Sequence, residues 1–200
     1  MNKAKRIYNQ QVSDKDKIYS WHEPHVDCIA KGKLHKKYEF GCKASFVVSS
    51  RANFIFGAKA FHKNPYDGHT LKEALDQSIR LTNKTPKEAY TDQGYKGHGI
   101  KDIEVILTRQ KTKSITKLKK QYQKRRNAIE PIIGHIKNDL KRGSRNFLKG
   151  EIGDKINAIA IATGFNLRKL LNYIDNNLLR PILWLIYKRF LVGNLVEISR

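Results

Sequence analysis

Two acidic residues in this strongly basic chain occupy positions where a carboxylate could do chemistry. Asp92 follows the short strand-like run Lys87–Thr91 and precedes the glycine-rich loop Gln93–Gly99. In α/β proteins, functional groups gather where strands end, at the carboxyl edge of the sheet. Glu130 lies within Asn127–Leu140, whose isoleucines recur at the helical period. A carboxylate at a strand end and another near a helix start are therefore the candidates for one site.

The residues around Glu130 predict a helix that begins or kinks close to it. Asn127, three residues before Glu130, gives the pattern of a capping box. Pro131 fits this position, because proline is tolerated far better in a first turn than in a helix interior. Arg126, Glu130 and Lys137 fall along one stripe of this helix. Taken alone, these features favour the simpler interpretation, a capping glutamate on a solvated basic helix.

Asp92 and Glu130 are the residue types that metal-dependent phosphodiester chemistry requires. Hard divalent ions prefer carboxylate oxygens, and Mg²⁺ takes only one or two of them per ion. Two such ions, about 3.5–4 Å apart, can activate an attacking oxygen and stabilise a leaving one. The simpler interpretation of Asp92 is an aspartate that caps its own turn.

The composition indicates a polyanionic partner. The 200 residues include 40 Lys+Arg and 18 Asp+Glu, a formal net charge of +22, so nucleic acid is the first candidate.

The chain is long enough for one domain with a core. Its two cysteines, Cys28 and Cys42, lack metal-type spacing, which argues against both a disulfide framework and a zinc site. The start of the chain has no apolar signal-peptide core, so a cytoplasmic location is expected.

The elements that must position the two acids form a mixed α/β pattern. A sheet begun by an antiparallel hairpin and extended by a strand after a crossover helix is expected. The expected strands are Tyr38–Ser49, Asn53–Phe61, Lys87–Thr91 and Glu104–Leu107. The expected helices are Leu71–Leu81 with a Thr70/Glu73 capping box, Thr112–Arg126, the Glu130 helix, a buried Ile152–Ile174 and Leu178–Val196. The last of these stretches carries charges and a proline. It is therefore expected to be a closing helix or an interface, and not a membrane span.

Several stretches resemble insertion-sequence DDE transposases, and most closely the group often called the insertion-sequence-five family. T-D-Q-G-Y-K-G at 91–97 and R-N-A-I-E-P-I-I-G-H-I-K at 126–137 resemble its second and third acidic motifs. Supporting stretches are Y-S-W-H-E-P (19–24), A-K-G-K-L-H-K-K-Y-E-F-G (30–41), K-N-P-Y-D-G-H-T-L (63–71) and R-N-F-L-K-G (145–150). The resemblance implies an α/β, RNase H-like mixed sheet flanked by helices, with a helical C-terminal part. The implied activity is cutting and joining DNA at transposon ends with two Mg²⁺ or Mn²⁺ ions.

The resemblance also implies roles for individual residues. Asp92 would be the second catalytic acid and Glu130 the third, and both would bind metal. Arg126 and Lys137 match the family's flanking basic pair, expected to contact DNA phosphates, and Arg125 and Lys141 are expected DNA contacts beside them. Gln123 stands where the family usually has a tyrosine.

No stretch of the chain resembles the family's first acidic motif. Asp14, Asp16, Asp27 and Asp67 are the upstream aspartates weighed in its place, and none lies in a matching strand. Asp67 closes the second hairpin strand and can therefore lie near the site, although a turn residue is its simpler interpretation. The chain is therefore interpreted as the C-terminal portion of a transposase, with a sheet incomplete at its N-terminal edge. The expected organisation is a polar segment 1–30, a partial catalytic domain 31–175 and an apolar helix or tail 176–200.

Two function classes remain beside the transposase catalytic domain. One is a non-catalytic nucleic-acid-binding remnant that keeps the basic surface, and the other is a basic RNA-binding protein, which explains the charge but not the ordered motifs. The expected partners are double-stranded transposon-end DNA and either a second copy of the chain or an upstream fragment, with no membrane. The expected location is the bacterial cytoplasm, in association with the nucleoid.

Overall fold

The computed structural model describes residues 2–31, 37–107, 121, 129–138, 143 and 145–197, with side chains up to residue 188. The chain divides into two compact units, Met1–Ala162 and Thr163–Arg200. The expected helix Thr112–Arg126 and the Asn127 half of the expected capping box lie outside the described residues.

Helices and strands are mixed along the first unit, as expected for an α/β protein. In chain order they are α1 (Asn2–Asn9), β1 (Asp27–Ala30), β2 (Tyr38–Gly41), β3 (Lys43–Val48), β4 (Ile55–Phe61), α2 (Asp67–Thr82), β5 (Glu88–Thr91), the 3-10 helix η1 (Gln93–Tyr95), β6 (Glu104–Leu107), α4 (Ile129–Lys137) and α5 (Gly150–Ile174). Helix α5 continues into the second unit, which also holds the π-helical turn η2 (Asp175–Leu179) and α6 (Arg180–Glu197). No helix among the described residues has the length and apolar character needed to cross a membrane.

The described strands pair two by two, and not in the single sheet expected from the sequence. Strands β1 and β2 are antiparallel, with Asp27 opposite Gly41, and β3 and β4 form an antiparallel hairpin. Strands β5 and β6 are parallel, with Glu88 opposite Glu104. The hydrogen-bonded ladders therefore form three two-stranded sheets.

The expected long strand Tyr38–Ser49 is in fact two strands with different partners. Gly41 has a φ of +144°, a conformation that L side chains rarely adopt and glycine adopts freely. The ladder partner changes at this residue, because β2 pairs with β1 up to Gly41 while β3 pairs with β4 from Lys43 on. The prediction missed this break, and it also missed α1 and β1 in the segment 1–30, which shows no sustained periodicity in sequence.

The helix after the hairpin begins earlier than its sequence pattern predicted. Helix α2 starts at Asp67, and the Thr70 hydroxyl donates to the Asp67 carbonyl over 2.8 Å and does not act as the cap. Helix α5 confirms the helix predicted over Ile152–Ile174, but the prediction that it is buried holds only in part. Its buried residues all lie between Gly153 and Ala162, and Ile152 and Ile156 are exposed. Helix α6 confirms the last predicted helix.

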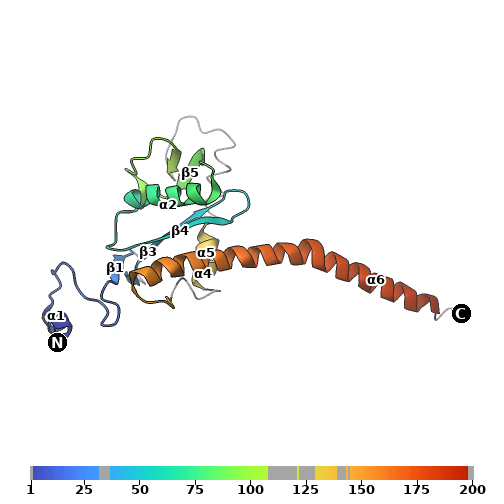
Figure 1. Ribbon diagram of the computed structural model, residues 1–200, viewed down its shortest axis with the longest axis horizontal. Coiled ribbons are helices and arrows are strands. Elements are labelled where there is room, and N and C mark those ends of the chain that lie inside the picture. The colour runs from blue at the N-terminus through green and yellow to red at the C-terminus, as the bar shows by residue number, and fades with distance from the viewer. Residues whose placement is uncertain are drawn as a thin grey trace. The chain divides into compact units, whose positions relative to one another are not determined.

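A small apolar core fixes α2 against two of the strand pairs. Leu71 and Leu75 of α2 pack with Ile103, and Val47 of β3, Ala89 of β5 and Val105 of β6 pack against them. Figure 1 shows α2 running alongside both the β3–β4 hairpin and β5. This core fixes the end of β5, where Asp92 follows.

Candidate functional site

Asp92 lies directly after β5, at the cap of the short helix η1. Its Oδ1 accepts a hydrogen bond from the Gln93 amide over 2.7 Å, and its carbonyl accepts one from the Tyr95 amide over 3.1 Å. The residue is exposed. One carboxylate oxygen thus stabilises the turn, as the simpler interpretation of Asp92 requires, and the residue stays accessible to solvent.

The loop after Asp92 packs against the first turn of α2. The Tyr66 hydroxyl donates to the Lys96 carbonyl over 2.9 Å. A Cβ added to Gly94 would lie 3.0 Å from Asp67 Oδ2, and one added to Gly68 would lie 3.1 Å from the Lys96 carbonyl. Glycine at these two positions therefore permits a close approach that brings Asp67 beside the Asp92 loop.

The phenol of Tyr95 interacts electrostatically with both of these aspartates. Burial raises the pKa of Tyr95, and the carboxylates of Asp67 and Asp92 raise it further. Hydrogen bonds with Ser45 and Thr70 act in the opposite direction. Asp67 is not an isolated acid, because its Oδ1 lies 2.9 Å from Lys43 Nζ. Asp67 and Asp92 thus both act on the Tyr95 phenol, and Lys43 partly neutralises the charge of Asp67.

Glu130 lies in the first turn of α4, as its sequence context predicted, and it is exposed. Ile132 and Ile136 form the buried face of the helix. In the last turn, Lys137 Nζ lies 3.5 Å from Glu39 Oε1 of β2. A DNA phosphate at Lys137 would have to compete with the Glu39 carboxylate.

The predicted site residues are placed on different elements. The contacts described for the Asp92 loop tie it to α2, and the Lys137–Glu39 pair ties α4 to β2. Among the described residues, neither Asp92 nor Glu130 belongs to a group of three possible metal ligands whose atoms lie within 4.8 Å of one another. Their convergence stays a prediction, and Arg125, Arg126 and Lys141 lie outside the described residues.

A different group, which the sequence analysis missed, does come together. His25, His62 and Asp154 place one ligand atom each within 4.8 Å of the others. Asp154 Oδ2 lies 3.0 Å from His62 Nε2 and 3.5 Å from His25 Nε2. His62 and Asp154 are 92 residues apart in the chain, so no local spacing could have signalled the cluster.

Further polar groups surround this cluster, called here the His25–His62–Asp154 cluster. Asn146 Nδ2 donates to Asp154 Oδ1. Glu23 Oε2 lies 3.3 Å from His25 Nε2 and accepts from the Gly150 amide over 3.0 Å. Burial, followed by the carboxylate of Asp154, raises the pKa of the Cys42 thiol to about 12. Cys28 and Cys42 are both free thiols.

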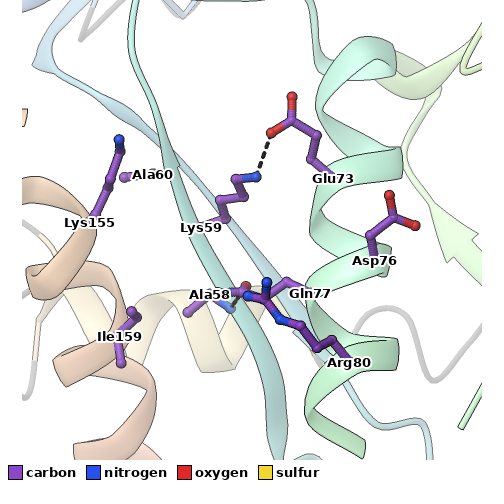
Figure 2. A pocket seen from close by; sticks show the side chains of 9 residues that line it. All are labelled: Ala58, Lys59, Ala60, Glu73, Asp76, Gln77, Arg80, Lys155 and Ile159. Carbon is purple, nitrogen blue, oxygen red and sulfur yellow. Dashed lines mark hydrogen bonds and ion pairs between the residues drawn. The ribbon is translucent and has the colours of Figure 1, made fainter. Parts of the chain in front are cut away.

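A shallow hollow of about 390 Å³ lies between β4, α2 and α5. Figure 2 shows Lys59 reaching from β4 to Glu73 of α2, while Lys155 and Ile159 approach from α5. Its lining also includes Asp76 and Arg80, so charges of both signs meet there. Neither Asp92 nor Glu130 lines this hollow, which is therefore separate from the predicted acids.

Comparison with known proteins gives one result. Residues 17–167 match the family described as "Transposase DDE domain", and this span contains Asp92, Glu130 and the His25–His62–Asp154 cluster. No curated protein and no solved structure matches the chain. Domains of this family use divalent metal ions and act in DNA transposition. With the match covering most of its length, the chain belongs to the transposase DDE domain family.

Proposed function

We propose that this chain is the C-terminal portion of an RNase H-like catalytic domain from an insertion-sequence transposase of the insertion-sequence-five group. The observation that carries the proposal is the family match over 17–167, which includes both acidic motifs in order. In this proposal residues 31–175 carry the catalytic part, between the polar segment 1–30 and the apolar helix 176–200. The setting would be the bacterial cytoplasm, on nucleoid DNA.

Asp92 and Glu130 are the proposed metal ligands. Both are exposed carboxylates, one after a strand and one in a first helical turn, and such hard oxygen donors suit Mg²⁺ or Mn²⁺. A bound ion of this kind polarises a phosphodiester and activates water. The protein's own part is to hold the two oxygens in place and to exclude other ligands. The Asp92 side chain is oriented for this by its bond to the Gln93 amide.

The proposed substrate is double-stranded DNA at transposon ends. A net charge of +22 favours association with any polyanion, and Lys137 together with Arg125, Arg126 and Lys141 surrounds Glu130 in sequence. The same charge supports the second candidate function, a non-catalytic nucleic-acid-binding remnant. Binding alone does not separate these two functions, whereas metal-dependent cleavage does.

We further propose that this chain by itself cleaves DNA poorly, because it lacks a stretch matching the family's first acidic motif. A two-ion site that loses its bridging carboxylate loses support for both the attacking and the leaving oxygen. Asp67 is the upstream acid beside the Asp92 loop, but Lys43 already pairs with it at 2.9 Å. Asp27 accepts a hydrogen bond from the Asn64 amide and is tied to β1.

The test is strand nicking by the purified chain, with Mg²⁺ or Mn²⁺, on a duplex that carries the terminal sequences of the source element. We expect salt-sensitive binding of the duplex and cleavage close to background. Glu130→Gln is the test variant, and Glu151→Gln is its matched control, because Glu151 is also exposed in the first turn of a helix.

Two outcomes would change the proposal. Robust nicking that Glu130→Gln abolishes and Glu151→Gln preserves would show a complete catalytic site and refute the expected inactivity. A chain that does not bind the duplex at low salt would refute a role in transposition for these residues.

A further inference from the structure

We propose that His25, His62 and Asp154 bind a transition-metal ion of the Zn²⁺ class, at a site separate from the Asp92 and Glu130 acids. The three residues come from the segment before β1, the residue after β4 and the first turns of α5. An ion there would hold these three parts of the first unit together. This role is structural and does not depend on the proposed cleavage reaction.

The spacing of the donor atoms fits a tetrahedral ion. With Zn–N and Zn–O distances of about 2.0–2.2 Å, the ligand atoms of a tetrahedral site lie roughly 3.3 Å from one another. The distances from Asp154 Oδ2 to His62 Nε2 and to His25 Nε2 are 3.0 Å and 3.5 Å, on either side of that value. The two imidazole rings meet edge to face, with centroids 5.7 Å apart, so both Nε2 atoms can face one point.

The donor types select the class of ion. Imidazole nitrogen suits zinc, copper, iron and nickel, whereas magnesium and calcium prefer oxygen ligands. Two histidines and one carboxylate are therefore a poor site for Mg²⁺ and a suitable one for Zn²⁺. The expectation against a zinc site rested on cysteine spacing and did not consider histidines so far apart in the chain.

The surroundings supply the polar support that metal ligands require. Asp154 is 7% exposed, and a buried carboxylate must be compensated by hydrogen bonds or by a cation. Asn146 donates to the second Asp154 oxygen, Oδ1, and thereby orients the carboxylate. Glu23 Oε2, 3.3 Å from His25 Nε2, is a further oxygen at the edge of the cluster. With three protein ligands, the fourth position is open to water or to Glu23.

The experiment is a Co²⁺ titration of the metal-depleted, untagged chain, in excess Mg²⁺ to occupy oxygen-only sites. We expect the strong visible absorption of tetrahedral Co²⁺, saturating at one equivalent and removed by Zn²⁺. His62→Gln and Asp154→Asn should each weaken binding by at least about tenfold, the lower range for disturbing a metal site. His22→Gln is the matched control, an exposed histidine in the same segment as His25.

Thermal unfolding by circular dichroism keeps the test decisive if a variant folds poorly. Zn²⁺ should raise the Tm of the wild-type chain and of His22→Gln, but not that of His25→Gln or His62→Gln. A wild-type chain that binds Co²⁺ without the tetrahedral spectrum would overturn the proposal. Binding by His62→Gln or Asp154→Asn as tight as that of the wild type would overturn it equally.

Discussion

The phenol of Tyr95 reports on the surroundings of Asp67 and Asp92. Its pKa is raised by burial and by these two carboxylates, which disfavour a third negative charge beside them. The phenol can therefore be used to test the position of Asp67 beside the Asp92 loop.

Replacing either acid should lower the Tyr95 pKa toward its ordinary value of 10.0, since one repulsive charge is removed. Asp67→Asn and Asp92→Asn are the test variants, and Asp102→Asn, an exposed aspartate ten positions after Asp92, is the control. The measurement is an NMR pH titration of ring-labelled tyrosine, with Tyr95→Phe to assign the signal. An unchanged Tyr95 titration in both variants would contradict the described geometry.

The raised pKa of Tyr95 also fixes the sign of the contribution that this residue makes to the pH dependence of stability. Because the folded-state pKa is raised, the contribution of Tyr95 to the free energy of unfolding is complete below 10.0. It is lost as the pH rises from that value toward the folded pKa.

Sequence reasoning gave the correct position for residues whose placement is set by near neighbours. Asp92 after a strand and Glu130 in a first helical turn were both predicted from adjacent residues. Asp154, His25 and His62 were not, because their meeting depends on how distant elements pack. Asp67 was weighed from the sequence as an acid able to lie near the site, and its contact with Gly94 places it beside the Asp92 loop.

Among the elements, α5 offers a direct comparison between two of its glycines. A Cβ at Gly153 would lie 2.7 Å from the Leu148 carbonyl carbon, whereas a Cβ at Gly164 would meet nothing within 4 Å. Gly153→Ala should lower the free energy of unfolding by about 1–3 kcal/mol, because backbone must move to relieve the overlap. Gly164→Ala should raise helix stability by roughly 0.5–1 kcal/mol, since alanine loses less backbone entropy than glycine.

Urea unfolding followed by circular dichroism measures both changes. The comparison is internal, because both variants add the same methyl group to the same helix. A Gly153→Ala chain as stable as the wild type would mean that Leu148 does not pack against α5 as described.

Element type was predictable where the local pattern was strong. Strands β5 and β6 and helix α5 match the elements predicted from composition and period at Lys87–Thr91, Glu104–Leu107 and Ile152–Ile174. The break at Gly41 was not, because it depends on β2 finding its partner β1, and strand pairing is not encoded in local alternation. The pairing of strands two by two escaped prediction for the same reason.

On the scale of the whole molecule, the net positive charge should dominate the binding of DNA. At +22 the chain should bind duplex DNA mainly by releasing counterions, so that affinity falls steeply with salt. Lys137→Ala and Arg126→Ala should each reduce the salt slope by about one contact. Lys3→Ala, an exposed lysine of α1 outside the matched span 17–167, is the control that should leave the slope nearly unchanged.

Fluorescence anisotropy of a labelled duplex over a salt series gives these slopes. An affinity that barely changes between low and moderate salt would contradict electrostatic binding. If Lys3→Ala reduced the salt slope as much as Lys137→Ala, DNA binding would depend on the total charge and not on where the charge lies.

The second unit presents apolar side chains to solvent, among them Leu183, Trp184 and Ile186 of α6. Exposed apolar patches of this kind mark interaction surfaces in soluble proteins. The feature accords with the interface expected from the sequence, and association with a second copy or an upstream fragment stays a prediction.

The His25–His62–Asp154 cluster also constrains when the protein can fold. Its His62–Asp154 contact spans 92 residues, and the neighbouring Gly150–Glu23 hydrogen bond spans 127. Loop closure costs more entropy as the loop lengthens, so such contacts form after local ones like the β3–β4 hairpin. During synthesis the segment around His25 leaves the ribosome long before Asp154 exists. The contacts of that segment with Asp154 and Gly150 can therefore form only after α5 has been synthesised.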